Sequence, residues 1–137
     1  MTRHPNQITH DIIGCAMKIH SRFGPGLLES AYEACLAYEL EKMGYRVKPV
    51  PLVYEAVRLE CGFRADIVVE NLVVVECKSK EQLHPVGTSQ VLSHLRLLGL
   101  PIGLLINFHV ERLKDGIVRL VNDYKEKPLT AEAAEAT

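Results

Sequence analysis

The sequence lacks a clear excess of either charge. Its 137 residues carry 16 Lys and Arg against 17 Asp and Glu, which gives a formal net charge of -1. Proteins that coat nucleic acids without sequence preference usually carry a basic excess, because contacts to phosphates supply most of that binding. The near balance therefore argues against a nonspecific nucleic-acid coat. Any contact with nucleic acid has to come from a local group of residues or from an oligomer.

Long apolar runs and targeting signals are also missing. No apolar stretch approaches the roughly 20 residues that cross a bilayer. Residues 1–14 contain no apolar segment followed by a cleavage site. We therefore expect no membrane segment, no secretion and a cytoplasmic location.

Several familiar motifs are absent. No cysteine belongs to a C-x-x-C pair or stands at zinc-finger spacing from a histidine, and there is no Walker loop and no G-x-S-x-G elbow. These absences exclude a zinc framework, a P-loop nucleotide site and a hydrolase nucleophile elbow. We expect the four cysteines to be small buried side chains in a reducing compartment. They are Cys15, Cys35, Cys61 and Cys77.

Apolar periodicity nonetheless predicts a full set of helices and strands. Side chains that repeat every three or four residues indicate helices at about 8–23, 28–43 and 85–98. Runs of β-branched and apolar residues indicate strands at 45–50, 52–59, 63–69, 72–78, 102–107 and 117–121. Pro49 and Pro51 mark the first of these as an edge strand or connector, because proline cannot donate to a ladder.

The order of these elements indicates one domain. It predicts an α/β (α+β) fold over residues 1–123, with a mixed sheet flanked by helices. Residues 124–137 are polar and rich in Ala and Glu, and we expect them to form a flexible tail.

Charged side chains interrupt the two most apolar strands. Glu76 and Lys78 follow the apolar run 72–75, and alternation places them on one face of the strand. Asp66 interrupts the preceding strand in the same way. Burying such groups costs free energy unless they pair or bind something. These three residues are therefore candidate functional residues.

The turn at Glu70 and Asn71 decides whether the three side chains meet. A strict two-residue loop would put Asp66 opposite Val75, on the wrong face to meet Glu76. A three-residue loop, or a bulge with Asn71 in the left-handed region, shifts the register by one residue. We predict the shifted register, in which the two carboxylates and Lys78 converge.

Two carboxylates and a lysine on one sheet face suit a hard divalent cation. Mg²⁺ takes oxygen ligands and usually binds a few carboxylates beside waters and substrate phosphate. Such a metal polarises a scissile phosphate and generates hydroxide, while the lysine positions water or stabilises negative charge. The structural alternative is an ion pair of Lys78 with Glu76 or with Asp66. Spacing alone does not separate the two interpretations.

Further motifs accompany these residues. They are a G-x-x-E-x-x-Y pattern at Gly26, Glu29 and Tyr32, F-R-A-D at 63–66, E-C-K at 76–78, Gln90, G-L-L-I-N-F at 103–108 and R-L-K-D-G-I at 112–117. In this order, from about residue 8 to residue 121, they make the chain similar to the GxxExxY family, placed within the PD-(D/E)XK nuclease superfamily. The resemblance implies a restriction-endonuclease-like core with the element order α-β-β-β-α-β.

The resemblance also implies roles for five residues. Asp66 and Glu76 match the metal-binding carboxylates of the superfamily, and Lys78 matches its catalytic lysine. Glu29 matches a helix-borne acidic residue that supports the metal or substrate water, and Gln90 matches a glutamine often near the site. The implied activity is Mg²⁺- or Mn²⁺-dependent hydrolysis of DNA phosphodiester bonds, with RNA as the alternative nucleic acid.

Other residues on the same elements receive structural interpretations. We expect Tyr32 to pack in the core, Glu33 to be a solvated helix residue and His94 to lie on a polar helix face. The sequence departs from the family pattern at Ala65, where the superfamily has its named proline. It also lacks the histidine that family relatives lead us to expect at 87–89.

A hypothesis of a different class stays open. The chain could be a non-catalytic nucleic-acid- or protein-binding module that keeps the nuclease fold as a scaffold, since fold alone does not establish chemistry. The near-neutral charge and the absence of a DNA-reading motif favour this second hypothesis. In either case a domain this small has little surface to wrap a duplex, so we expect a homodimer.

Overall fold

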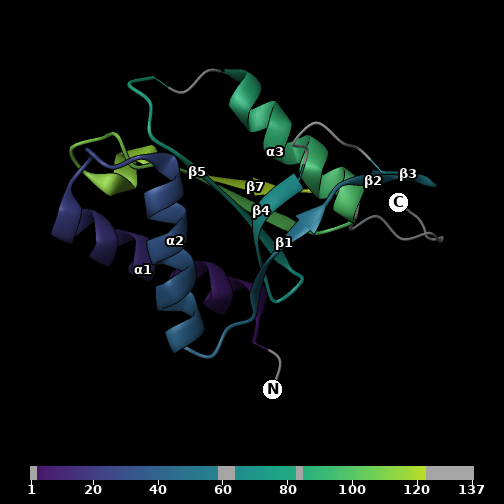
Figure 1. The fold of residues 1–137 in the computed structure, drawn as a ribbon, viewed down its shortest axis with the longest axis horizontal. Helices are drawn as coiled ribbons and strands as arrows, with labels where there is room; N and C mark the ends of the chain where they lie inside the picture. Colours follow the sequence, from purple (N-terminus) through teal and green to yellow (C-terminus); the bar gives the residue numbers. More distant parts are fainter. Residues whose placement is uncertain (1–2, 59–63, 83–84, 123–137) are drawn as a thin grey trace.

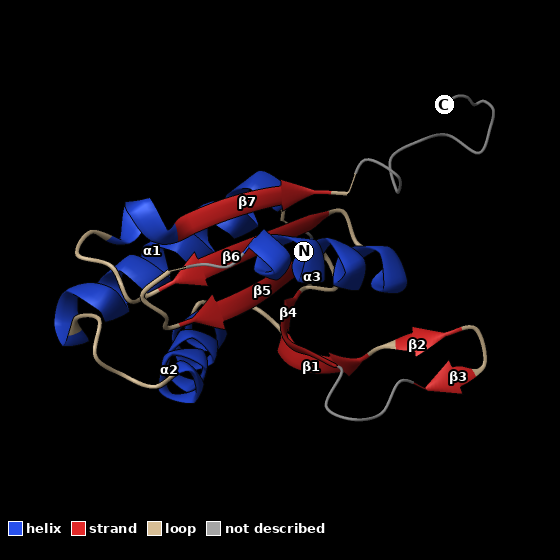
Figure 2. Cartoon of the chain, turned by 90° about the horizontal axis from the view of Figure 1, so that it is seen from above, coloured by secondary structure: helices blue, strands red, loops and turns tan. Residues whose placement is uncertain are grey.

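A mixed five-stranded sheet lies between two layers of helices in the computed structural model, which describes residues 3–58, 64–82 and 85–122 (Figure 1). The strand order is β1-β4-β5-β6-β7, and a separate ribbon, β2-β3, projects beyond the sheet (Figure 2). The elements are α1 (Pro5–Phe23), α2 (Glu29–Lys42), β1 (Val47–Pro51), β2 (Val53–Tyr54), β3 (Val57–Arg58), β4 (Arg64–Val69), β5 (Val73–Lys78), α3 (Pro85–Leu98), β6 (Ile102–Asn107), η1 (Leu113–Gly116) and β7 (Ile117–Val121).

This architecture confirms the predicted mixed sheet flanked by helices. α1 and α2 cover one face of the sheet, and α3 covers the other (Figure 1). Within the described ranges, no helix has the length and apolar character to cross a bilayer. The predicted tail at 124–137 lies outside the described residues.

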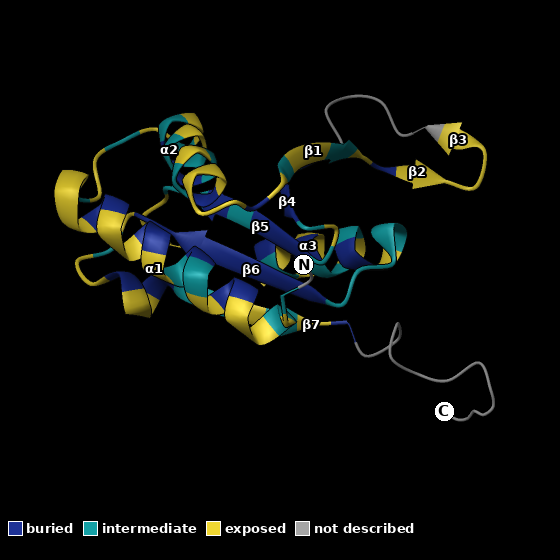
Figure 3. Cartoon of the chain, turned by 90° about the horizontal axis from the view of Figure 1, so that it is seen from below, coloured by how far each residue is buried: buried dark blue, intermediate teal, exposed yellow. Residues whose placement is uncertain are grey.

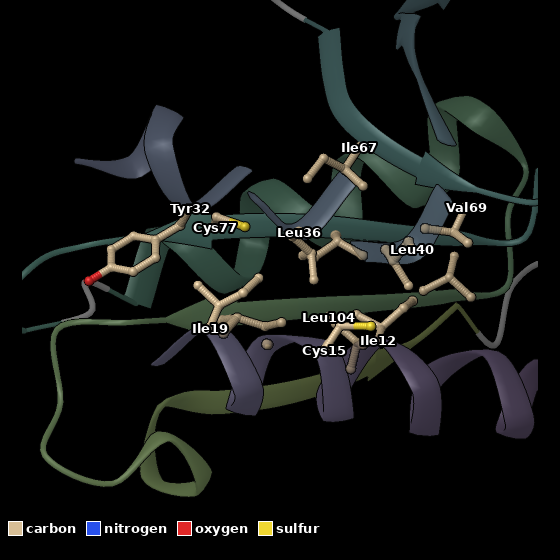
Figure 4. Packing of buried hydrophobic residues seen from close by; sticks show 14 of the residues in the cluster. Ile12, Cys15, Ile19, Tyr32, Leu36, Leu40, Ile67, Val69, Cys77 and Leu104 are labelled. Atoms are coloured by element: carbon tan, nitrogen blue, oxygen red, sulfur yellow. The ribbon is translucent and has the colours of Figure 1, made fainter. Parts of the chain in front are cut away.

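The larger apolar cluster lies between the sheet and the helices α1 and α2 (Figure 4). Tyr32 is fully buried there and stacks on Phe108 with ring centroids 4.1 Å apart, which confirms its expected packing role. Leu28 and Met43, at the two ends of the helix predicted at 28–43, are instead 77% and 42% exposed. They are the N-cap and C-cap residues of α2, so neither belongs to the buried face of the helix.

The parallel pair β5 and β6 forms the buried centre of the sheet (Figure 3). Every residue of β6 is buried. α3 packs closely on this centre at Gly103, where an added Cβ would lie 2.8 Å from Val91 Cγ1. The side chains of Val91 and Leu95 therefore occupy the space that a larger residue at Gly103 would need.

The predicted strand at 52–59 is wrong in one respect. The chain turns at Glu55, whose φ is 52°, and folds the segment into the two short strands of the β2-β3 ribbon. A single strand cannot continue through a residue in the left-handed region.

The β4–β5 hairpin has the predicted shifted register. Val69 pairs with Val73, so the loop holds three residues, Glu70, Asn71 and Leu72. Both Glu70 and Asn71 have a φ of 56°, in the left-handed region. Asparagine tolerates this conformation better than most residues, so Asn71 favours the three-residue loop.

This register leads up to the charged residues. Ile67 and Val75 form the last pair of the ladder, and Asp66 and Glu76 are the next residues on their two strands. The loop at Asn71 therefore sets the register of the ladder that ends beside Asp66 and Glu76.

We expect Asn71→Val to lower the free energy of unfolding by about 1–2 kcal/mol, because a β-branched residue is strained at positive φ. Urea denaturation of wild type and Asn71→Val measures this difference in unfolding free energy. Asn71→Gly is the matched control, since glycine adopts this conformation without a Cβ clash and should unfold close to wild type. Equal losses of unfolding free energy in both variants would show that the left-handed backbone at position 71 does not determine the stability of the hairpin.

Candidate active site

β4 carries a bulge at Asp66. Between two registered residue pairs, β1 contributes only Pro49 while β4 contributes both Asp66 and Ile67. Proline donates no ladder hydrogen bond, so it suits a position opposite a bulge. Ala65 then packs in the cluster under α3 and Ile67 in the cluster under α1 and α2, although strict alternation would put both on one face. Asp66 therefore lies where the strand crosses from one layer to the other.

The two strands part beyond this point. The ladder between β4 and β5 ends at the pair Ile67 and Val75, just before Asp66 and Glu76. β4 instead continues along β1, which curves away from β5 (Figure 2). Side chains from both helical layers act on Asp66 and Glu76 at this position, as the electrostatics of Glu33 and His94 show.

Glu33 reaches Asp66 from α2. The two carboxyl groups share a hydrogen bond, and burial, followed by the charges of Asp66, Glu76 and Glu29, raises the pKa of Glu33 to about 7. A hydrogen bond between two carboxyl groups needs a proton on one of them. The interpretation of Glu33 as a solvated helix residue is therefore wrong. Its spacing of four residues from Glu29 was the available signal, because such residues share a helix face.

Glu76 and Lys78 form an ion pair on the last part of β5. Lys78 Nζ lies 3.3 Å from Glu76 Oε2, and their side chains are 17% and 20% exposed. The ion pair expected under the structural alternative is therefore present. Both charged groups of the pair are largely screened from water. The Lys78 ammonium lies next to Glu76, which acts on Glu33 together with Asp66 and Glu29. We call these four carboxyl side chains the acidic group.

Glu29 ties the start of α2 to the end of β5. Its Oε2 accepts a hydrogen bond of 3.2 Å from the backbone N–H of Ser79, the residue after Lys78. The Ser79 hydroxyl in turn donates to the Leu27 carbonyl at 3.0 Å. Glu29 also contributes to the raised pKa of Glu33, so it lies within electrostatic range of the other acids. In this structure its direct contact is with the backbone that carries Lys78.

The hydroxyl of Tyr32 holds the loop before α2. It donates to the Gly24 carbonyl and accepts from the Leu27 N–H at 3.1 Å. Tyr32 and Glu29 thus fasten the loop 24–27 and the helix start to the sheet.

Asn107 fixes the chain on the other side of Ser79. Its side chain is buried, accepts from the N–H groups of Lys80 and His109 at 3.1 and 3.2 Å, and donates to the Lys80 carbonyl at 2.8 Å. Asn107 therefore caps the turn that follows β6. The backbone around Lys78 is therefore held from α2 and from β6.

His94 faces the same charges from α3. Burial lowers its pKa, Glu76 and Asp66 act to raise it and Lys78 acts to lower it. Its Nδ1 is buried and has no hydrogen-bond partner among the residues that the structure describes. His94 lines a groove with Ser89, Gln90 and Ser93, so it belongs to the expected polar face of α3 and also lies within electrostatic range of the charged groups.

Gln90 lies one turn before His94 on α3. Its side chain is exposed, and it lines a groove together with His94. Gln90 therefore lies on the groove side of α3, whereas His94 also lies within electrostatic range of Glu76, Lys78 and Asp66.

Cys77 lies beneath the acidic group. It is fully buried, and burial raises its pKa, with further contributions from the negative charges of Glu33, Glu76, Glu29 and Asp66. Cys15 is buried and Cys35 is half-buried, and both are free thiols. These positions agree with the expected role of small packing residues, while Cys61 lies outside the described residues.

The donor chemistry fits a hard divalent cation. Across the three described ranges, no three His, Cys, Asp or Glu side chains are arranged closely enough to hold a metal ion together. Glu76 is paired with Lys78, and Asp66 is hydrogen-bonded to Glu33. Mg²⁺ nevertheless needs only one or two carboxylates beside waters and phosphate. The accumulated negative charge that raises the pKa of Glu33 is the charge that a cation would neutralise.

Comparison with known families assigns the chain. Residues 6–120 match the family model of the PD-(D/E)XK nuclease superfamily, which covers most of the 137 residues. The chain therefore belongs to this superfamily, and the five-stranded mixed sheet with helices on both faces is consistent with its fold. No curated protein and no solved structure matches the sequence.

The raised pKa of Glu33 predicts a pH dependence of stability. The folded state keeps this proton up to about pH 7, whereas the unfolded chain loses it near 4.5. Stability therefore falls as the pH rises from about 4.5 to about 7. We expect Glu33→Gln to flatten this decline and to raise stability at alkaline pH by on the order of 1 kcal/mol, a value discounted for solvent screening.

Thermal unfolding across the acidic to neutral range measures this effect. The matched control is Glu41→Gln, an exposed residue on the same helix, which should keep the wild-type slope. An unchanged slope in Glu33→Gln would show that Glu33 does not hold the proton.

Proposed function

We propose that the protein is a metal-dependent nuclease that hydrolyses DNA phosphodiester bonds. Asp66 and Glu76 hold Mg²⁺ or Mn²⁺, and Lys78 acts on the attacking water. Glu29 and Gln90 support the site, and Glu33 joins it through its hydrogen bond to Asp66. A bound divalent cation supplies polarisation of the scissile phosphate and a nucleophilic hydroxide.

One observation carries this proposal. Asp66 and Glu76 directly follow the last registered pair of the β4–β5 hairpin, and Lys78, two residues after Glu76, is in ion-pair contact with it. This D…E-x-K arrangement occurs in a chain that belongs to a nuclease superfamily. The three residues are the ones that the sequence pattern selected on chemical grounds.

The residues of the chain divide the work between them. Lys78 donates N–H groups from a largely screened position, where it can orient a water or stabilise negative charge on the phosphate. Glu29 and Asn107 hold the backbone on either side of Ser79 and so fix the direction of the Lys78 side chain. Lys80 is exposed just beyond, where its ammonium can contact the substrate backbone.

We also place the chain in the GxxExxY family within this superfamily. Gly26, Glu29 and Tyr32 carry the motif. The contacts of Tyr32 with the loop 24–27 and of Glu29 with Ser79 give the motif a positioning function beside the proposed site. RNA as substrate, a homodimer and a cytoplasmic location stay predictions.

The alternative function is a non-catalytic binding module that keeps the nuclease fold. The ion pair that occupies Glu76 and Lys78, together with the net charge of -1, favours this alternative. The two functions differ in one testable respect. A nuclease cleaves nucleic acid and loses this cleavage when the carboxylates or the lysine are removed, whereas a binding module cleaves none.

Cleavage assays with Mg²⁺ and Mn²⁺ test the proposal. Supercoiled plasmid, linear duplex, single-stranded DNA and single-stranded RNA are incubated with wild type, Asp66→Ala and Lys78→Ala. We expect metal-dependent cleavage by wild type and a loss of about 10²-fold or more in each variant.

Asp115→Ala and Lys114→Ala are the matched controls, because both residues are exposed on η1. They should cleave like wild type. Wild-type cleavage that persists in Asp66→Ala would contradict the assigned site. A folded wild type that cleaves none of the substrates with either metal would support the binding module instead.

A further inference from the structure

α2 carries two half-buried carboxyl groups near its start, at Glu29 and Glu33. They are one helical turn apart and therefore share a face of the helix. The neighbouring side chains Tyr32, Leu36 and Leu40 turn this part of α2 toward the sheet (Figure 4). The sequence resemblance implies that Glu29 supports the metal or the substrate water. The contacts of the two carboxyl groups show which of them is suited to that role.

Glu29 contacts the backbone that follows β5. Its Oε2 accepts a hydrogen bond of 3.2 Å from the N–H of Ser79, directly after Lys78. The Ser79 hydroxyl donates to the Leu27 carbonyl at 3.0 Å, which joins the same backbone to the loop before α2. A change at Glu29 therefore acts first on the position of Lys78.

Glu33 contacts the carboxylates themselves. One turn of helix advances the chain by about 5.4 Å, which carries α2 from the backbone at Ser79 to the level of Asp66. There the Glu33 side chain shares a hydrogen bond with Asp66, and the charges of Asp66, Glu76 and Glu29 all act on it. α2 therefore places a carboxyl group in direct contact with a proposed metal ligand.

A hydrogen-bonded pair of carboxyl groups has the spacing that a cation needs. The oxygen atoms of an O–H···O hydrogen bond lie about 2.5–3.0 Å apart. Neighbouring oxygen ligands of an octahedral Mg²⁺, each about 2.1 Å from the ion, lie about 3 Å apart. A cation can therefore replace the hydrogen that Asp66 and Glu33 share without a large movement of β4 or α2. Two carboxylates satisfy Mg²⁺ when waters and substrate phosphate fill its other positions, so no third protein ligand is required.

We propose that Glu33, rather than Glu29, is the α2 carboxylate that holds the divalent cation together with Asp66. This inference rests on the proposed metal-dependent nuclease function, and it specifies the ligands of the metal site. Glu29 is instead a positioning residue, which acts on Lys78 through the backbone at Ser79.

Calorimetric titration of Mn²⁺ into the full chain, at about pH 8 where carboxylate ligands are deprotonated, tests the proposal. We expect Glu33→Gln to weaken Mn²⁺ binding by about tenfold or more. The glutamine amide still donates a hydrogen bond to Asp66, so a purely structural role of Glu33 predicts wild-type affinity instead. The variant therefore distinguishes a metal ligand from a packing contact.

Glu29→Gln is the matched variant, because it removes one charge from the same acidic group. Its amide oxygen still accepts a hydrogen bond from the Ser79 N–H, and we expect a loss of Mn²⁺ affinity of about threefold or less. Glu41→Gln, at an exposed position of α2, should bind Mn²⁺ like wild type. Wild-type affinity in folded Glu33→Gln would overturn the proposal, as would a larger loss of affinity in Glu29→Gln than in Glu33→Gln.

Thermal stabilisation by Mn²⁺ is a second measurement, which also shows whether each variant is folded. A cation that binds the folded chain raises its unfolding temperature. We expect this rise in wild type, Glu29→Gln and Glu41→Gln, and a smaller rise at the same Mn²⁺ concentration in Glu33→Gln. An equal rise in Glu33→Gln and in wild type would contradict the proposal.

The outcomes for Glu33 and for the nuclease are separable. Metal-dependent cleavage by wild type that is lost in Asp66→Ala, with unchanged Mn²⁺ affinity in Glu33→Gln, would retain the nuclease and overturn the role of Glu33. Mn²⁺ binding that is lost in Glu33→Gln, without cleavage of any nucleic acid by wild type, would support the metal ligand and reject the nuclease. A wild type that binds no Mn²⁺ would overturn the proposal.

Discussion

The bulge in β4 is the constraint on which the arrangement of the site depends. It lets the strand change faces between Ala65 and Ile67, so Asp66 lies between the two helical layers. Glu33 from α2 and His94 from α3 both interact with Asp66 for this reason. In a regular strand Asp66 would face one layer only. Bulges frequently re-aim a side chain next to an active site, and Pro49 on the neighbouring strand suits the position opposite this bulge.

The acidic group is held at a cost in stability. Burial, followed by the charges of four carboxylates, raises the pKa of the Cys77 thiol, and burial, followed by the charges of Asp66, Glu76 and Glu29, raises the pKa of Glu33. Within the described structure, the proton on Glu33 and the ammonium of Lys78 offset part of this repulsion. Local conflicts of this kind cluster at functional sites, where a ligand relieves them. The rigid supports around Lys78, from Glu29 and Asn107, fit the same interpretation, because a reactive group has to be held in place.

The sequence predicted the parts of the fold that depend on local patterns. The bounds of α3 and β6 follow from periodicity and flanking glycine or proline, and the hairpin register follows from the tolerance of Asn71 for positive φ. The bulge was not predicted, since it depends on pairing with a distant segment at Pro49. The roles of Glu33 and His94 were missed for a related reason. Their partners come from other elements, and spacing along one helix does not show which residues of the sheet lie beneath it.

The central claim is that the carboxylates around Asp66 form a divalent metal site. Calorimetric titration of Mn²⁺ into the purified chain tests this most directly, with Asp66→Asn as the site variant and Asp115→Asn as the exposed control. The structure predicts saturable binding by wild type and by the control, and a loss of about tenfold or more in affinity for Asp66→Asn. Mn²⁺ binding of equal affinity in folded Asp66→Asn, or no binding by wild type, would contradict the account.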